Sequence, residues 1–589
     1  MKMKNILKHL SVPIINQISF FLICFTLLVF PAIARKELFD ISFFSTIFLE
    51  VSTVLFISYI LTCIVYVFKN KIVKILLYSL TIAIFIFWLF LKVVMNLTIT
   101  PMILIVLLET NSKESSEFIH NVLLSKQSIF VLLSFLGIIT ATYFLEKYRS
   151  RISTYILRFI PSKIRYTSLY LLFITILWGG GFLANTTHKL YHADDKRIDK
   201  LDIKYFHWRN PIVKLLFAFK GLNIIEQQIQ TSFQTNIRVS KEKTKVLSQE
   251  DINIIVVIGE SFIKHHSSLY GYYLQTNPFL EKEKLNGNLF VFNDVITTAS
   301  RTSESLKNLF SCNSYSLGES FSNFPLFTVV FKSANYNVYM WDNQTDFAST
   351  QFATATLNSF LYNKDIYSIS YTQTNNKTFA YDKDLIKDFK HQQLANQGNN
   401  LLIFHLMGQH NEAQERFPKS FAKFSYKDIK HFANYLNQEK MQMIADYDNA
   451  TLYNDYVLEQ IIDLYRDKNT VIIYFSDHGE EMFDYRDAHF RPGCLGDWYN
   501  FLKYQYEVPF FIWCSDKYKE LHSETIKQIN DAVNKPFAID NLCHILFYFA
   551  NIDTKYYKQE RNILTDKYKP VDRMTDNKIN YDSVMRTKH

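Results

Sequence analysis

The chain has 589 residues, more than one domain usually holds, so at least two domains are expected. Hydrophobic residues make up 48% of it and charged residues 20%, which excludes both a wholly soluble and a wholly membrane-embedded protein. The formal net charge is +9, but many basic residues lie beside apolar runs, and no basic stripe is interleaved with stacking aromatic residues. We therefore predict no nucleic-acid partner.

The first third of the chain contains apolar segments that are long enough to span a bilayer. We expect five transmembrane helices, at Ile14–Ile33, Phe43–Phe68, Ile75–Leu91, Ser128–Leu145 and Tyr166–Leu183. Lys and Arg cluster before the first segment, between the second and third, and between the fourth and fifth. By the positive-inside rule, the N-terminus is cytoplasmic and the chain after about Leu183 lies outside the cytoplasm.

The first segment has an alternative interpretation. The sequence Ala32-Ile33-Ala34 resembles a cleavage site, so this segment could be a signal peptide that is removed. The four remaining spans would still place the C-terminal part outside the cytoplasm. We favour the retained helix.

The loop between the third and fourth spans is rich in polar groups, among them Thr110, Asn111 and Glu114. It is either a solvated loop with a helix capped by Asn111, or a contact surface for lipid headgroups. Further on, Pro211 to Ile229 carries apolar residues at helical spacing. This pattern predicts a helix that lies on the outer membrane surface or packs against the globular part.

From Asp251 onward the sequence alternates between strand and helix patterns, and the longest helix is expected from about Met441 to Tyr465. This alternation predicts an α/β domain with a central, mostly parallel sheet sandwiched by helices. We expect a membrane domain over residues 1–185, a connector over 186–250, a globular domain over 251–565 and a tail over 566–589. The predicted strands are Ile252–Ile258, Leu289–Val295, Asn337–Trp341, Asn400–His405, Thr470–Phe475 and Val508–Trp513.

The first predicted strand of this domain is a run of β-branched residues that ends at Gly259, directly before Glu260 and Ser261. Ligands in open α/β sheets bind at the carboxyl ends of the strands, so Glu260 lies where a functional carboxylate is expected. Taken alone, it is equally well an ordinary residue of a strand-to-loop junction.

A second apolar strand, Thr470–Phe475, is followed by Ser476, Asp477, His478, Gly479 and Glu480. A carboxylate and an imidazole in sequence are a typical pair of zinc ligands. His405 and His410 follow another strand, and we expect His405 to be structural and His410 to contact either phosphate or a residue that binds the ligand. His489 lies in a later loop of aromatic and charged residues.

Hydroxyl side chains in TTASRTSESLKNLFS, from Thr297 to Ser311, precede an apolar pattern that indicates the start of a helix. Backbone N–H groups and the helix dipole make such a start an anion site. Thr302 or Ser303 is either a simple N-cap or, beside a metal ion, an activated nucleophile.

These stretches, together with SLYGYYLQTNP and YDNATLYNDY (Tyr447–Tyr456), resemble the membrane-bound phosphoethanolamine transferases of the alkaline phosphatase/sulfatase superfamily. The resemblance covers nearly the whole chain, the five spans included. It implies an alkaline-phosphatase/sulfatase-like globular domain and a metal ion held by Glu260, Thr302, Asp477 and His478, with Thr302 as the nucleophile.

The resemblance also assigns substrate contacts. His410 and His489 match additional histidines that contact the phosphoryl group or a second metal ion. Thr110 and Glu114 keep the Thr-x3-Glu spacing of a lipid headgroup site. The family implies zinc, although a ligand set rich in oxygen would also accept manganese.

The sequence departs from one branch of this family. In the lipid A-modifying and colistin-resistance branch, two cysteines that form a disulfide flank the nucleophile, where this chain has Thr298 and Asn308. An Asn of the membrane loop is Val106 here. Six cysteines are present, none of them in a CxxC pair, and the sequence leaves open whether Cys312 and Cys494 pair.

The resemblance implies an enzyme of the bacterial inner membrane, with its catalytic domain in the periplasm. Its donor would be phosphatidylethanolamine and its acceptor lipid A or the lipopolysaccharide core, which implies resistance to polymyxin-like peptides. The alternatives are glycerol-phosphate transfer, as in lipoteichoic acid synthases, and phosphoethanolamine transfer to a glycan or protein. A sulfatase is disfavoured because no Cys begins a CxPxR motif. A non-enzymatic binding protein is disfavoured because the nucleophile and the ligands are all present.

Overall fold

The computed structural model describes residues 2–33, 41–95, 97–109, 125–159, 162–193, 210–247, 250–344, 361, 364–394, 398–430 and 433–587. The chain forms two compact units, residues 1–225 and 226–589. The domain limits expected from the sequence stay predictions.

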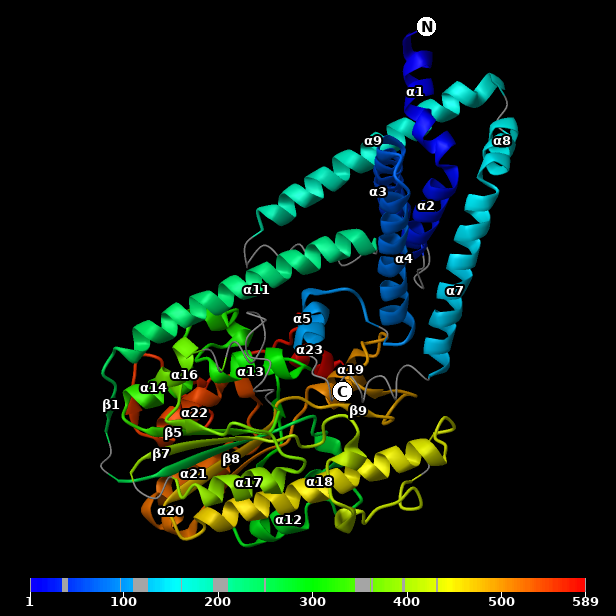
Figure 1. Cartoon of the computed structure of the whole chain (residues 1–589). Coiled ribbons are helices and arrows are strands. Elements are labelled where there is room, and N and C mark those ends of the chain that lie inside the picture. The colour runs from blue at the N-terminus through cyan, green and yellow to red at the C-terminus, as the bar shows by residue number, and fades with distance from the viewer. Residues whose placement is uncertain are drawn as a thin grey trace. The chain divides into compact units, whose positions relative to one another are not determined.

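The first unit is helical (Figure 1). Among its described residues, four helices are long and apolar enough to cross a membrane, which confirms the predicted helical membrane region. A fifth candidate is a pair, α1 and α2, bent by 82° at Gln17, so the first predicted span is not one straight helix. The helices are α1 (Lys2–Asn16), α2 (Ile18–Ile33), α3 (Ile41–Phe68), α4 (Lys71–Val93), α5 (Pro101–Glu109), α7 (Lys126–Lys147), α8 (Arg149–Phe159), α9 (Ser162–Tyr191) and α11 (Pro211–Ser240), of which α11 continues into the second unit.

Two of the basic clusters lie at the same end of this helical unit. Lys74, near the start of α4, forms an ion pair of 2.7 Å with Glu146, near the end of α7. The Oε1 atom of Gln17 accepts hydrogen bonds from Lys74 and from Arg149 at the start of α8. This arrangement is the one that the positive-inside rule requires, and the side of the membrane that this end faces stays a prediction.

Helix α11 begins at Pro211, as expected, but continues to Ser240. Its last part belongs to the second unit, where Asn236 Oδ1 accepts a 2.8 Å hydrogen bond from the backbone N–H of Leu326. This part of the helix packs on the globular domain. A membrane-surface position for the earlier part stays a prediction.

The second unit is built on a sheet of seven strands in the order β3-β11-β8-β2-β7-β5-β6, all parallel except β11. This confirms the mostly parallel α/β sheet. The predicted strand Leu289–Val295 is two short strands, because the chain leaves the large sheet after Phe292. The strands are β1 (Lys245–Val246), β2 (Asn253–Gly259), β3 (Leu289–Phe292), β4 (Val295–Ile296), β5 (Asn337–Asp342), β6 (Gln373–Thr374), β7 (Asn400–His405), β8 (Thr470–Ser476), β9 (Glu481–Met482), β10 (His489–Phe490), β11 (Phe510–Cys514), β12 (Phe537–Ala538) and β13 (Ile552–Asp553).

Helices cover both faces of the sheet (Figure 1). Because side chains alternate along a strand, Ile255 and Val257 of β2 pack in the core shared with α12, α17 and α18. Helices α13, α14 and α22 lie on the other side of the sheet in Figure 1. The helices are α12 (Pro278–Leu285), α13 (Thr302–Phe310), α14 (Phe327–Ser333), α16 (Lys364–Ser370), α17 (Asp382–His391), α18 (Gln438–Tyr465), α19 (Trp498–Gln505), α20 (Asp516–Leu521), α21 (Ser523–Ala532), α22 (Leu542–Phe549) and α23 (Tyr581–Arg586).

In the first unit, α9 packs closely against α3 through consecutive glycines. A Cβ atom on Gly179 would lie 2.0 Å from the backbone oxygen of Ser52, and one on Gly180 would lie 2.6 Å from the ring of Phe56. A Cβ atom on Gly181 would meet nothing within 4 Å. Small residues allow helix backbones to approach in a membrane, so Gly179 sets the distance between these two helices.

We therefore expect Gly179→Ala to destabilise the helical unit, by about 1–3 kcal/mol, because the added methyl group overlaps the backbone of α3. Gly181→Ala is the matched control. It adds the same methyl group two residues further along α9, where the Cβ atom would meet nothing within 4 Å. Thermal unfolding of the two variants in detergent measures the difference. Equal melting temperatures would show that α3 and α9 do not pack through Gly179.

Candidate metal centre

Two carboxylates are brought together by the register of neighbouring parallel strands. Gly259 of β2 pairs with Ser476 of β8, so the next residues, Glu260 and Asp477, leave the sheet side by side. His478 Nε2 lies 3.2 Å from Glu260 Oε1 and 3.2 Å from Asp477 Oδ2. All three side chains are fully buried, and they form a group that can hold a metal ion.

Thr302 is the first residue of α13 and joins this group. Its hydroxyl donates a 3.1 Å hydrogen bond to Glu260 Oε2 and lies 3.3 Å from His478 Nε2. The N-cap of α13 is Arg301, so neither Thr302 nor Ser303 is the N-cap, and that alternative was wrong. The structure thus brings all four predicted ligand residues together.

His478 presents its Nε2 atom to the group. Its Nδ1 atom lies 2.8 Å from the carbonyl oxygen of Gly479, which can only accept a hydrogen bond. The proton is therefore assigned to Nδ1, and the lone pair of Nε2 is left to bind a metal ion. In the structure Arg491 Nη1 donates a 2.8 Å hydrogen bond to this lone pair, and a bound metal ion would replace that hydrogen bond.

The loop after β2 is held in a constrained conformation by the long helix α18. Ser261 has a φ of +57°, a region that non-glycine residues rarely adopt. The Tyr447 hydroxyl donates to the Ser261 carbonyl at 2.5 Å and accepts from the backbone N–H of Ile263 at 2.7 Å. Tyr447 thereby places the backbone next to Glu260.

The two carboxyl groups are electrostatically unequal. Burial raises the pKa of Glu260, but interactions with the His478 and His410 imidazoles and with the Arg491 guanidinium outweigh it and hold the pKa well below its usual range. Burial and the neighbouring Glu260 hold the pKa of Asp477 well above its usual range. Asp477 Oδ2 is buried without a hydrogen-bond partner. A divalent cation at this position would satisfy that oxygen and favour the ionised form of both carboxyls.

The remaining predicted histidines differ in their surroundings. His410 interacts electrostatically with Glu260 and His478, and burial lowers its pKa to about 3, so its imidazole is neutral. His489 packs on the rings of Phe483 and Phe490, and burial lowers its pKa to about 4. His405 is buried against Asp342, as expected for a structural histidine. The contact roles of His410 and His489 stay predictions.

Two site residues were missed from the sequence. Arg491 follows His489 by two residues in a loop without a strand or helix pattern. Gln344, just after β5, donates to Glu260 Oε2 at 3.1 Å and to the Leu406 carbonyl at 2.7 Å. Gln344 could have been found from the sequence, because a polar amide that closely follows an apolar strand lies at the edge of the sheet where ligands bind. Thr110 and Glu114 lie outside the described residues.

The six cysteines are free. Cys312 is buried, and its thiol is hydrogen-bonded to Cys543.

Burial raises the pKa of the Glu480 carboxyl to about 8, although Arg491 lowers it. A cation alongside Glu480 would favour its ionised form.

Residues 252–543 match the Sulfatase family model, and this part of the chain is a sulfatase-family domain. The chain is also similar to the phosphoethanolamine transferases. It is 29% identical over 336 residues to phosphoethanolamine transferase EptC of Escherichia coli K12, covering 56% of each chain. It is also 29% identical over 278 residues to Kdo(2)-lipid A phosphoethanolamine 7''-transferase of the same strain, covering 46% of each. The chain thus spans about half the length of the curated relatives it matches.

Two solved structures of phosphoethanolamine transferases are similar to this chain. The periplasmic domain of Escherichia coli EptC in complex with Zn has a TM-score of 0.50 and 26% identity, covering 58% of this chain and 95% of that one. The membrane protein lipooligosaccharide phosphoethanolamine transferase A of Neisseria meningitidis has a TM-score of 0.60 at 16% identity, covering 94% and 98%. At that identity the likeness shows the fold, with its apolar helices and α/β domain, over nearly the whole chain.

Removal of either carboxylate should weaken metal binding strongly. We expect Glu260→Gln and Asp477→Asn each to lower affinity for divalent metal by about 100-fold or more, since both remove a charged ligand. Glu507→Gln is the control, because Glu507 is a buried carboxylate that pairs with Lys264 and His265 instead. Metal analysis of purified protein gives the readout. Full metal content in Asp477→Asn would contradict the assignment.

Proposed function

We propose that this protein transfers phosphoethanolamine from phosphatidylethanolamine to an envelope glycolipid, lipid A or the lipopolysaccharide core. The observation that carries the proposal is the position of the Thr302 hydroxyl, 3.1 Å from Glu260 and 3.3 Å from His478 at the start of a helix. The sulfatase-family domain and the names of the similar transferases support the reaction class.

The first step of the proposed reaction is attack of Thr302 Oγ1 on the phosphorus of the donor. The bond from phosphorus to the diacylglycerol oxygen breaks, diacylglycerol leaves with the proton that Thr302 gave up, and phosphoethanolamine is left on Thr302. Glu260 Oε2 accepts the hydrogen bond of the hydroxyl and is placed to take its proton. The N-terminus of α13 and the Arg491 guanidinium supply positive charge for the phosphoryl oxygens.

In the second step, an oxygen of the glycolipid attacks the phosphorus and releases Thr302. Two displacements suit a site that donor and acceptor visit in turn. We assign the metal ion as zinc, held by Glu260, Thr302, Asp477 and His478; the zinc complex of the similar EptC domain supports this choice. When bound, zinc lowers the pKa of a coordinated hydroxyl and neutralises charge on the phosphoryl oxygens.

The proposed location is the bacterial inner membrane, with the N-terminus in the cytoplasm and the sulfatase-family domain in the periplasm. The two basic clusters that meet at one end of the helical unit support this orientation. Thr110 and Glu114 are proposed to contact the lipid headgroup, and His410 and His489 the phosphoryl group.

We expect Thr302→Ala to abolish transfer while the protein still folds, because the substitution removes one hydrogen bond to a carboxylate, worth about 1.5–3 kcal/mol. Lipid mass spectrometry of bacteria that express each variant shows whether the glycolipid gains phosphoethanolamine. Ser303→Ala, which removes the neighbouring hydroxyl, is the matched control.

Transfer at the wild-type level in Thr302→Ala would remove Thr302 from the mechanism. A wild-type glycolipid of unchanged mass would contradict the proposed acceptor. In that case a glycan or protein that gains phosphoethanolamine, or a product that gains glycerol phosphate, would identify the alternative reaction.

A further inference from the structure

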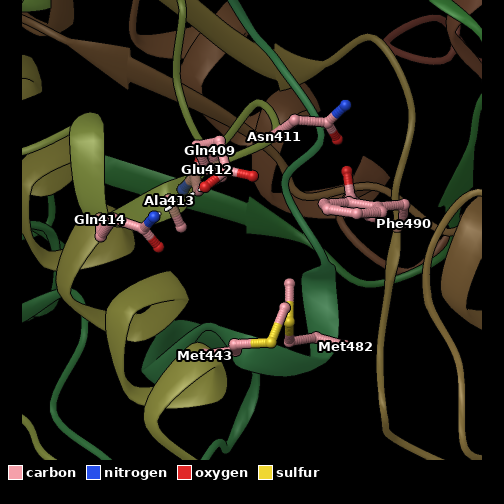
Figure 2. A pocket seen from close by; sticks show the side chains of 9 residues that line it. Gln409, Asn411, Glu412, Ala413, Gln414, Met443, Met482 and Phe490 are labelled. Atoms are coloured by element: carbon pink, nitrogen blue, oxygen red, sulfur yellow. Dashed lines mark hydrogen bonds between the residues drawn. The ribbon is translucent and has the colours of Figure 1, made fainter. Parts of the chain in front are cut away.

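A pocket lies beside the proposed metal centre. It is lined by polar residues of the loop after β7 and by apolar side chains, among them Met443, Met482 and Phe490 (Figure 2). Its empty volume is about 320 Å³, open solvent included. The backbone N–H of Gln409, a lining residue, donates to the Glu260 carbonyl at 3.1 Å, and Glu480, another lining residue, follows the ligand His478 by two positions. The pocket therefore lies next to the chain segments that carry Glu260 and His478.

The polar residues of this pocket leave buried oxygens without partners. Gln409 Oε1, Asn411 Oδ1 and Glu480 Oε2 are all buried, and none has a hydrogen-bond partner. Gln409 and Glu480 are each only 1% exposed. Buried oxygens in proteins normally accept hydrogen bonds, so three without a partner around one pocket point to a ligand that donates hydrogen bonds.

The orientation of the Gln409 amide is fixed by its neighbour. The Thr451 hydroxyl donates its proton to the Tyr447 carbonyl at 3.0 Å, so its oxygen is left as an acceptor. Gln409 Nε2 lies 3.3 Å from that oxygen and donates to it. The amide cannot turn over without losing this bond, and its oxygen remains the group available to a ligand.

The loop that carries Gln409 and Asn411 is held rigidly. Arg416 is 4% exposed and donates to the carbonyls of His410 and Asn411. Asp382 accepts from the backbone N–H groups of Met407 and Gly408, both at 2.9 Å. A Cβ atom on Gly408, whose φ is +52°, would lie 2.9 Å from the backbone of Glu260, so only glycine allows this approach. The pocket is a preformed part of the site.

We propose that this pocket binds the ammonium group of the transferred phosphoethanolamine. A primary ammonium has three N–H donors and no acceptor, which matches three unpartnered oxygens, one of them a carboxylate oxygen. Met443, Met482 and Phe490 supply apolar and aromatic surface for the two methylene groups and the face of the cation. The inference rests on the proposed function and deepens it, since it assigns the residues that select ethanolamine over an uncharged substituent.

The test compares two soluble substrates with the full-length, metal-loaded protein in detergent. One is p-nitrophenyl phosphoethanolamine, and the other is p-nitrophenyl propyl phosphate, in which a methyl group replaces the ammonium. Release of p-nitrophenol gives kcat/KM for each, and their ratio measures recognition of the charge. We expect the wild-type protein to prefer the first substrate by at least about 10-fold.

Glu480→Gln and Gln409→Met should each lower this ratio by about 10-fold to 100-fold, because each removes one acceptor of the ammonium. Glu415→Gln is the control and should keep the ratio, since Glu415 is exposed on the same loop and is not a lining residue of the pocket. Metal analysis of every variant shows whether the neighbouring centre is intact. A purely structural role would lower both rates and leave the ratio unchanged.

The outcomes separate this inference from the proposed function. Equal rates for the two substrates in a wild-type protein that modifies the glycolipid would overturn the subsite alone. Loss of a second metal ion from Glu480→Gln would assign the pocket to a metal and also overturn it. A protein that hydrolyses neither substrate and leaves the glycolipid unchanged would overturn the proposed function and the inference together.

Discussion

Two buried carboxylates, side by side at the ends of adjacent parallel strands, are the constraint around which this domain is arranged. Because Gly259 of β2 pairs with Ser476 of β8, the residues that follow them, Glu260 and Asp477, lie side by side. Both are fully buried, and a cation bound between them would relieve the cost of placing two negative charges there. The position of the candidate metal site thus follows from one strand register.

Much of the fold could be predicted because its strongest patterns are local. The apolar runs of β2, β7 and β8 are buried on both faces, and a continuous apolar run of this length predicts a buried strand. The bend between α1 and α2 was missed, because hydropathy records apolar character and not direction. The split of Leu289–Val295 into two strands was missed for a similar reason, since the pairing partners of β4 lie far away in the sequence.

Some residues of the candidate site could be predicted from local sequence patterns, and others could not. Glu260, Asp477 and His478 follow apolar strands directly, so their meeting point could be inferred from the rule that parallel strands end at one edge. Arg491 reaches the site from an irregular loop, and nothing in its neighbours signals this. The acceptor character of Gln409 depends on a hydrogen bond to Thr451 on another element, which only the tertiary structure reveals.

The central claim is that phosphoethanolamine passes through a covalent bond to Thr302. Peptide mass spectrometry of the protein, incubated with phosphatidylethanolamine in the absence of acceptor, tests it most directly. The account predicts phosphoethanolamine on the peptide that contains Thr302, and its disappearance when glycolipid is added. A protein that turns over donor while Thr302 stays unmodified, or that carries the group on another residue, would contradict the account.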